Sequence, residues 1–235
     1  MSFTVRRANC RLSARARPVL PDRRTTTLPE GAENPARFNA EPASSTGDDM
    51  SSALLVMDVQ RAIVDIADDG SGYLPRLRRA IDGARAAGIP VIYVVIALRP
   101  GFPEVGTRNR ALAAIARAGL YVEGTPGTEI HPEVAPRPGD VVVTKRRASA
   151  FSGSDLDVVL RARGIRSLVL TGIATSAVVL STLCHANDLD FGLTVLSDAC
   201  LDTDPEVHRV LVERLFPQWA DVVTVGDWLK TIASQ

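Results

Sequence analysis

The stretch Leu168-Val-Leu-Thr-Gly-Ile-Ala-Thr-Ser-Ala-Val-Val-Leu-Ser-Thr182 decides the fold of this chain. Its first apolar run predicts a buried strand, and a second apolar segment follows Thr171-Gly172 almost without a loop. A strand that turns straight into a helix leaves the first backbone N–H groups of that helix unpaired, at the positive end of the helix dipole. Such a turn is a cradle for an anion or a developing oxyanion, but it is also the ordinary form of a β-α joint, in which Gly172 merely allows the turn.

Apolar strands and amphipathic helices alternate on both sides of this stretch. Continuous apolar runs predict buried strands at residues 53–57, 91–98, 141–144, 167–171, 193–196 and 222–225. Apolar residues at helical spacing predict helices at 74–84, 108–118, 156–160, 173–186 and 205–215, with a short helix at the end. This alternation predicts an α/β fold with a parallel sheet covered on both faces. Residues 121–139 form a turn-rich connection of the kind that often lines a site or a subunit contact.

The composition sets the broad class of protein. The 235 residues are 46% hydrophobic, which is enough for one α/β domain with a core. Lys+Arg and Asp+Glu both number 27, so the net charge favours neither nucleic acid nor a membrane as partner. No apolar run approaches the ~18 residues of a membrane span. The three cysteines, at 10, 184 and 200, form no disulfide framework or CxxC pattern, which fits a cytoplasmic location.

Residues 1–50 differ in composition from the rest of the chain. Up to Arg24 there are seven arginines, no lysine and one acid, and the segment shows little apolar periodicity. This composition predicts a disordered N-terminal extension. A transit peptide is an alternative, although no amphipathic helix is evident, and translation from Met50, directly before the first strand, is another. The folded domain is predicted over residues 51–235.

Three polar features follow predicted strands at their carboxyl ends, where open parallel sheets bind ligands. They are Asp58, Lys145 and the turn from Gly172 to Val178. Taken singly, Asp58 is equally well a paired or capping carboxylate, and Lys145 a solvated charge in the basic run that continues to Arg147. Their shared position at three strand ends makes a common site an equally good interpretation.

Several blocks of sequence carry a family resemblance. They are Leu54-Leu-Val-Met-Asp58-Val-Gln60, Gly127-Thr-Glu-Ile130, Pro138-Gly-Asp140-Val-Val-Val-Thr-Lys145, Ser149-Ala-Phe151-Ser-Gly-Ser-Asp-Leu156, Thr171-Gly-Ile-Ala-Thr175 and Val195-Leu-Ser-Asp-Ala199. In this order they resemble the isochorismatase-like hydrolases, also called the cysteine hydrolase superfamily, from Ala53 to about Val225. The resemblance implies a three-layer α/β/α sandwich around a six-stranded parallel sheet, Rossmann-like in form and assembled as a homodimer or homotetramer.

The amidase branch of this family uses an Asp, a Lys and a Cys as a triad. The resemblance puts Asp58 and Lys145 on the first two positions, but the third falls on Val178. Valine has no nucleophilic atom, so the acyl-enzyme route of that branch is closed here. Cys184 is no substitute, because six residues along a helix place it roughly 9 Å further on and about 240° around. We expect Cys184 to be a small buried hydrophobic residue.

Two other nucleophiles are poor candidates: Cys200 follows a strand where the family has none, and nothing in the sequence activates Ser176. True isochorismatases also lack the Cys. There the Asp acts as a general acid that protonates the vinyl-ether carbon, and water captures the oxocarbenium ion. That role needs a carboxyl group whose pKa is raised by burial, as is expected of Asp58 at the end of an apolar strand. Those enzymes have Gly where this chain has Val178 and an Ala-His pair near Thr175-Ser176, which argues against isochorismate itself.

Nicotinamidases, the metal-binding members, carry Asp-x-His where this chain has Ala97-Leu-Arg-Pro100. The histidines at 131, 185 and 208 are not at ligand spacing, so the sequence predicts no metal and no other cofactor. The family's non-proline cis peptide falls on Ile173–Ala174. The resemblance then implies that the backbone N–H groups of Ala174 and Val178 are the oxyanion donors.

Three functional hypotheses follow. The first is a cysteine-free hydrolase of a small organic acid, amide or vinyl ether, in which Asp58 acts as general acid or base toward a water and Lys145 holds charge. The second is a non-catalytic relative that binds a metabolite or a partner subunit in the same pocket. The third is an unrelated reaction in that pocket. The presence of both Asp58 and Lys145 favours the first.

Overall fold

Six parallel strands form the sheet of this chain in a computed structural model, which describes residues 52–67, 70 and 72–234. The strands are β1 (Ser52–Met57), β2 (Val91–Ile96), β3 (Val141–Lys145), β4 (Ser167–Ile173), β5 (Gly192–Leu201) and β6 (Asp221–Val223). They lie in the order β3-β2-β1-β4-β5-β6, and every neighbouring pair is parallel. The predicted α/β fold is confirmed, and the expectations for residues 1–50 lie outside the described residues.

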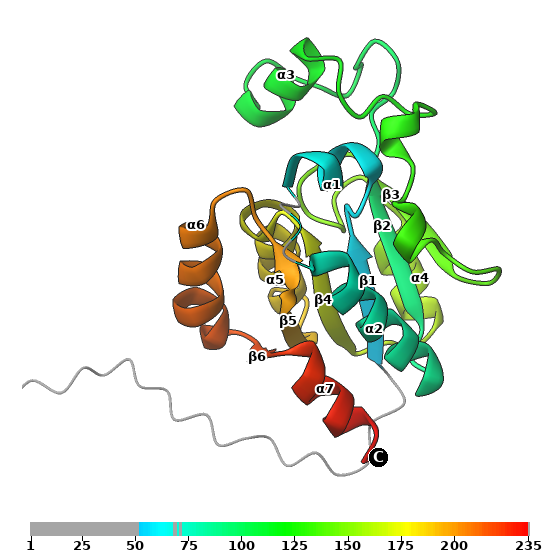
Figure 1. The fold of residues 1–235 in the computed structure, drawn as a ribbon. Coiled ribbons are helices and arrows are strands. Elements are labelled where there is room, and N and C mark those ends of the chain that lie inside the picture. The colour runs from blue at the N-terminus through cyan, green and yellow to red at the C-terminus, as the bar shows by residue number, and fades with distance from the viewer. Residues whose placement is uncertain (1–51, 68–69, 71, 235) are drawn as a thin grey trace, which may run out of the picture. The chain divides into compact units, whose positions relative to one another are not determined.

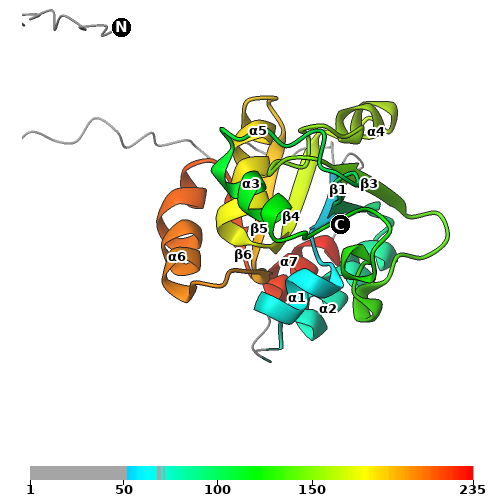
Figure 2. The same ribbon diagram turned by 90° about the horizontal axis from the view of Figure 1, so that it is seen from above.

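Helices cover both faces of the sheet, which makes three layers (Figures 1 and 2). The helices are α1 (Arg61–Ala67), α2 (Tyr73–Ala86), α3 (Arg110–Arg117), α4 (Leu156–Ala162), α5 (Leu180–Asn187), α6 (Pro205–Val210) and α7 (Val225–Ile232). On one face, Leu156 of α4 and Leu183 of α5 join the core. On the other, the core includes Leu77 of α2 and Trp228 of α7. No helix within the described ranges is long and apolar enough to cross a membrane.

The central strand β1 shows why the strand sequences are continuously apolar. Successive side chains of a strand point to opposite faces, so Leu55 and Met57 pack with one core and Leu54 and Val56 with the other. Both faces are covered by helices, and none of these four residues is more than 1% exposed. The apolar run therefore ends where β1 leaves the core, at Asp58.

Gly172 allows β4 to lie against β1 at the end of that strand. It pairs with Met57 in the parallel register and has a φ of 144°. A Cβ atom at this position would stand 2.2 Å from the Met57 carbonyl oxygen. A side chain is excluded here both by the backbone conformation and by this close approach.

Several predicted boundaries are wrong. β5 extends to Leu201 instead of ending near residue 196, because Cys200 and Leu201 pair with β4 after an irregularity in the register. Val225 begins α7 and does not end β6. The helix expected directly after Gly172 is preceded by one wide π-helical turn, Thr175–Val179, and only then continues as α5. α1 was not predicted, since this short helix buries only Val64.

Candidate active site

Asp58 and Lys145 meet at the carboxyl edge of the sheet. Asp58 follows β1 with a φ of 56°, and its N–H donates to the Val94 carbonyl of β2 at 2.8 Å. Lys145 is the last residue of β3, on the far side of β2. Lys145 Nζ lies 2.8 Å from Asp58 Oδ2, with side chains only 1% and 7% exposed. The pair is therefore a buried ion pair, and Lys145 is not a solvated charge.

The two oxygens of the Asp58 carboxyl group differ in their surroundings. Oδ2 accepts from Lys145, whereas Oδ1 is buried and has no hydrogen-bond partner among the described residues. Burial raises the pKa of Asp58 above its ordinary value, and the Lys145 charge opposes that rise. Lys145 Nζ also donates to the Arg147 carbonyl at 2.9 Å, so the ammonium group is held in place. Oδ1 is therefore the carboxyl oxygen that is left without a protein partner.

A cavity of about 280 Å³ opens onto this pair. Most of its walls come from three segments that are distant in the sequence. α1 contributes Ile63, Ile66 and Ala67; α3 contributes Ala111, Leu112 and Ile115; and the end of β4 with the turn after it contributes Ile173, Ala174, Ala177 and Val178. The structure thus brings all five predicted site residues, Asp58, Lys145, Ile173, Ala174 and Val178, to one cavity.

The turn after β4 has a defined backbone form. The Ile173–Ala174 peptide bond is cis, as the family resemblance implies. Asp202 Oδ2 accepts the Ser176 N–H at 2.7 Å, so one of the helix-terminal donors expected to be free is already paired within the protein. Ser176 itself is exposed and does not line the cavity. The turn therefore offers fewer free N–H donors to an anion than the sequence suggests.

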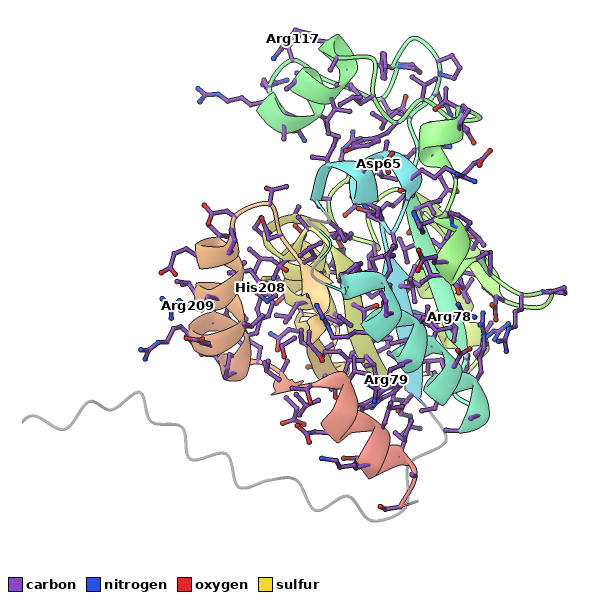
Figure 3. The ribbon with its side chains drawn as sticks, viewed as in Figure 1. Asp65, Arg78, Arg79, Arg117, His208 and Arg209 are labelled. Atoms are coloured by element: carbon purple, nitrogen blue, oxygen red, sulfur yellow. The ribbon has the colours of Figure 1, made fainter. Side chains whose placement is uncertain are left out.

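His208 of α6 holds the same turn from the other side. Its Nδ1 lies 2.8 Å from the hydroxyl oxygen of Thr175, which is fully buried. Burial lowers the pKa of His208, and the Asp202 charge opposes this. Figure 3 shows the neighbouring Arg209 directed away from the sheet, as its partners on the helix surface, Glu206 and Glu213, require.

Gln60 fixes the end of β2 beside the ion pair. Its side-chain amide accepts the Ile96 N–H at 2.9 Å and donates to the Ile96 carbonyl at 2.9 Å and the Thr128 carbonyl at 2.8 Å. Gln60 is fully buried, so these bonds form in a low-dielectric setting. It belongs to the motif with Asp58, and the structure gives it a positioning role.

The segment that carries α3 begins after Leu98, beyond the end of β2, and comes back beside Leu98 at Val122. The two residues form a parallel bridge. The Leu98 N–H donates to the Tyr121 carbonyl at 2.7 Å, and the Glu123 N–H donates to the Leu98 carbonyl at 2.8 Å. α3 lies above α1 in Figure 1, and both helices line the cavity.

Sequence reasoning missed several residues of the cavity. Tyr121 lines it with a φ of 57°, and burial together with the Asp58 charge raises the pKa of Tyr121. Asn109 and Thr203 also line it. The turn-rich character of residues 121–139, which include Tyr121, was the only indication of them in the sequence. These cavity residues come from connections, and local sequence does not determine the course of a connection.

The described cysteines lie outside the cavity. Cys200 of β5 is buried in the core, and burial raises its pKa to about 12. Cys184 on α5 is exposed, so the expectation that it is a buried hydrophobic residue is wrong. Residues 184 and 178 lie on different turns of the helix, which directs only Val178 toward the ion pair.

We predict that a thiol reagent separates these two cysteines in the native protein. Cys184 should react within minutes with iodoacetamide at pH 8, because its sulfur is accessible. Cys200 should react only after unfolding, because it is buried and its pKa of about 12 leaves almost no thiolate. Peptide mass spectrometry of labelled native and urea-unfolded protein measures both. Equal labelling of the two in the native state would contradict the burial of Cys200.

The histidines make local hydrogen bonds through Nδ1 to partners near them in the fold: His131 to the Glu133 N–H, His185 to the Ser149 hydroxyl and His208 to the Thr175 hydroxyl. In the described part of the chain, no three His, Cys, Asp or Glu side chains gather where they could hold a metal ion. The expectation that the protein needs no metal stays a prediction.

Comparison with solved structures gives the class of the fold. It is similar to that of a cysteine hydrolase from Pseudomonas syringae pv. phaseolicola, with a TM-score of 0.73 over 80% of this chain and 95% of that chain, at 24% identity. The chain belongs to the isochorismatase family, because the family model for the Isochorismatase domain matches residues 52–227.

Two relatives bear names that specify an activity. A ureidoacrylate amidohydrolase RutB from Rhizobium rhizogenes is 32% identical over 228 residues, which cover 87% of this chain and 93% of that protein. The crystal structure of an N-carbamoylsarcosine amidase from Thermoplasma acidophilum is similar at a TM-score of 0.62 and 28% identity, over 75% of this chain and 97% of that chain.

Proposed function

We propose that this protein is a hydrolase that uses Asp58 and Lys145 to activate water, without a cysteine nucleophile. The observation that carries the proposal is the buried Asp58–Lys145 pair, whose Oδ1 has no partner among the described residues and which faces a cavity. Val178, which the family resemblance puts on the Cys position of the amidase branch, lines the same cavity. A bound water is therefore the nucleophile that this arrangement favours.

The reaction on an amide runs through Asp58 as general base. Its carboxylate takes a proton from the water, whose oxygen attacks the amide carbon. The backbone N–H groups of Ala174 and Val178 hold the oxyanion that forms, and Lys145 keeps the carboxylate oriented through Oδ2. When the C–N bond breaks, the proton on Asp58 passes to the leaving nitrogen.

A vinyl ether would use the same group in its protonated form. Asp58 then donates a proton to the terminal vinyl carbon, and water captures the oxocarbenium ion. The direction of the Asp58 pKa shift supports this role, because burial raises the pKa and so favours the protonated form that donates the proton. The names of the ureidoacrylate amidohydrolase and the N-carbamoylsarcosine amidase favour a C–N bond as the one that is broken.

The test is a panel of amides and vinyl ethers assayed with wild type, Asp58→Asn and Asp65→Asn. We expect wild type to exceed Asp58→Asn by at least about 100-fold in kcat/KM on some member of the panel, since a general base contributes roughly that much. Asp65→Asn is the matched control, because Asp65 lies exposed on α1 (Figure 3) and should match wild type.

A second candidate is a non-catalytic relative that binds a metabolite or a partner subunit. Val178 favours it, since this residue supplies no nucleophilic atom to the cavity. Equal inertness of wild type and Asp58→Asn across the panel would leave only this candidate. Val178→Cys then adds a further measurement: a gain of amidase activity would mean that the pocket is competent and lacked only the thiol.

A further inference from the structure

Lys145 is the only cationic side chain lining the cavity in the part of the chain that the structure describes. Its ammonium group contacts Asp58 at 2.8 Å and donates to the Arg147 carbonyl at 2.9 Å. The pair carries no net charge when both groups are ionised. A substrate carboxylate would have to compete with Asp58 for this ammonium group, or rely on neutral donors alone, without a counter-charge.

Arg146 and Arg147 follow Lys145 in the sequence but use their guanidinium groups elsewhere. Arg146 donates to the Ala97 carbonyl and pairs with Glu123 at 3.1 Å. Arg147 donates to two backbone carbonyls, at 2.7 and 2.8 Å. Neither arginine lines the cavity. The basic run therefore provides no receptor for an anion at this site.

The walls opposite the ion pair are apolar. Ile63 and Ile66 of α1 face the cavity, as do Leu112 and Ile115 of α3. The exposed fraction of Ile66 is 65%, which puts a large apolar side chain in contact with solvent at the cavity. Asn109 is polar, but its side-chain oxygen accepts the Leu112 N–H at 3.1 Å and caps α3. Such walls gain free energy from an apolar ligand and none from a charged one.

We propose that the substrate is an uncharged molecule with an apolar body and one hydrolysable polar group, such as an aliphatic or aryl carboxamide, and is not an organic acid. This inference rests on the proposed function, since it assumes that the polar group meets Asp58. The apolar body then lies between α1 and α3, and the amide carbonyl lies beside the turn after β4. An anionic end would lie against Ile63 and Ile115 without a counter-charge.

The test compares two methyl ketones that have no bond to hydrolyse. 2-Heptanone and 6-oxoheptanoate differ only in that a terminal methyl group is replaced by a carboxylate. Ligand-observed NMR titration of the wild-type protein at pH 7.5 measures both dissociation constants. We expect 2-heptanone to bind at least about 100-fold more tightly, because the buried carboxylate has no unpaired cation to meet.

Two arginine variants of α3 provide a matched pair. Ile115→Arg adds an unpaired cation to the cavity wall. The ratio of the dissociation constants of 6-oxoheptanoate and 2-heptanone should therefore fall by at least about tenfold. Ala114→Arg adds the same charge at the adjacent exposed position, which does not line the cavity, and should keep the wild-type ratio.

The outcomes separate this inference from the proposed function. Equal or tighter binding of 6-oxoheptanoate overturns the inference, as does the absence of binding by both ketones. The same comparison in turnover uses hexanamide and adipamate. Selective binding of 2-heptanone with no turnover of any amide or vinyl ether of the panel supports the inference and removes the proposed function. Turnover of adipamate in preference to hexanamide supports the proposed function and overturns the inference.

Discussion

Replacing Gly172 by alanine is expected to destabilise the fold by at least about 4 kcal/mol, a magnitude reserved for severe defects of packing or backbone. The added Cβ would stand 2.2 Å from the Met57 carbonyl oxygen and 2.9 Å from the Met57 Cβ. Neither atom can move away without a large cost in free energy, because Met57 lies in the central strand β1 and pairs with Gly172. Relief requires the separation of β1 from β4 directly below Asp58.

Gly88→Ala is the matched control for this prediction. Gly88 also has a positive φ, of 73°, but no atom lies within 4 Å of the place that an added Cβ would occupy. It should therefore show only the conformational cost, of roughly 1–2 kcal/mol. Urea unfolding followed by circular dichroism measures both variants. A Gly172→Ala protein as stable as Gly88→Ala would show that β1 and β4 tolerate a wider spacing than the structure describes.

Lys145→Met is expected to cost about 3–5 kcal/mol of folding free energy at pH 8, because it leaves Asp58 as a buried carboxylate without a counter-charge. The double variant Asp58→Asn/Lys145→Met should recover most of this loss. Asparagine tolerates the left-handed backbone of residue 58 and carries no charge. A double variant no more stable than Lys145→Met would mean that the loss comes from packing and not from the unpaired charge.

The pH dependence of Lys145→Met follows from the pKa of Asp58. Burial raises this pKa in the folded protein, and removal of Lys145 takes away the largest opposing influence. A carboxyl group whose folded pKa is raised contributes stability below its unfolded pKa, and this contribution is lost as the pH rises through the folded pKa. Acidification from pH 8 should therefore narrow the stability gap between Lys145→Met and wild type.

Lys230→Met provides the surface control for the buried pair. Lys230 pairs with Asp227 at 2.8 Å, the same separation as in the buried pair, but the two side chains are 80% and 60% exposed. Water screens this pair, so its loss should cost at most about 1 kcal/mol. Urea midpoints between pH 5 and pH 8 compare both lysine variants with wild type.

The sequence predicted the sheet well because buried parallel strands have an unambiguous pattern. β1 and β4 are mostly continuous apolar runs, and the polar residue that follows β1 is Asp58. Contact between Asp58 and Lys145 follows from the rule that parallel strands present their carboxyl ends at one edge. The apolar pattern does not determine the order of the strands, which sets β2 between these two residues.

The end of β5 and the contacts of Asp202 could not be predicted from the sequence, because they depend on tertiary partners. β5 continues through Asp198, whose side chain accepts the Val225 N–H at 2.7 Å and whose carbonyl accepts from Arg76 at 2.9 Å. The local sequence predicts an end to the strand there, since Ser197-Asp198 resembles the start of a loop. Asp202 pairs with the turn after β4 from another strand end, and nothing in its own neighbourhood in the sequence indicates this.

The excursion that carries α3 is closed at its stem by the Leu98–Val122 bridge. The segment between these two residues is held at this stem and by the hydrogen bond from Arg147 to the Glu104 carbonyl, at 2.8 Å, so its length can vary without a change in the register of β2 or β3. A different loop with the same stem would reshape one wall of the cavity and leave the Asp58–Lys145 pair intact. In this architecture the residues that select the substrate can therefore change independently of the residues that carry out the chemistry. A new specificity can arise by exchange of this one segment.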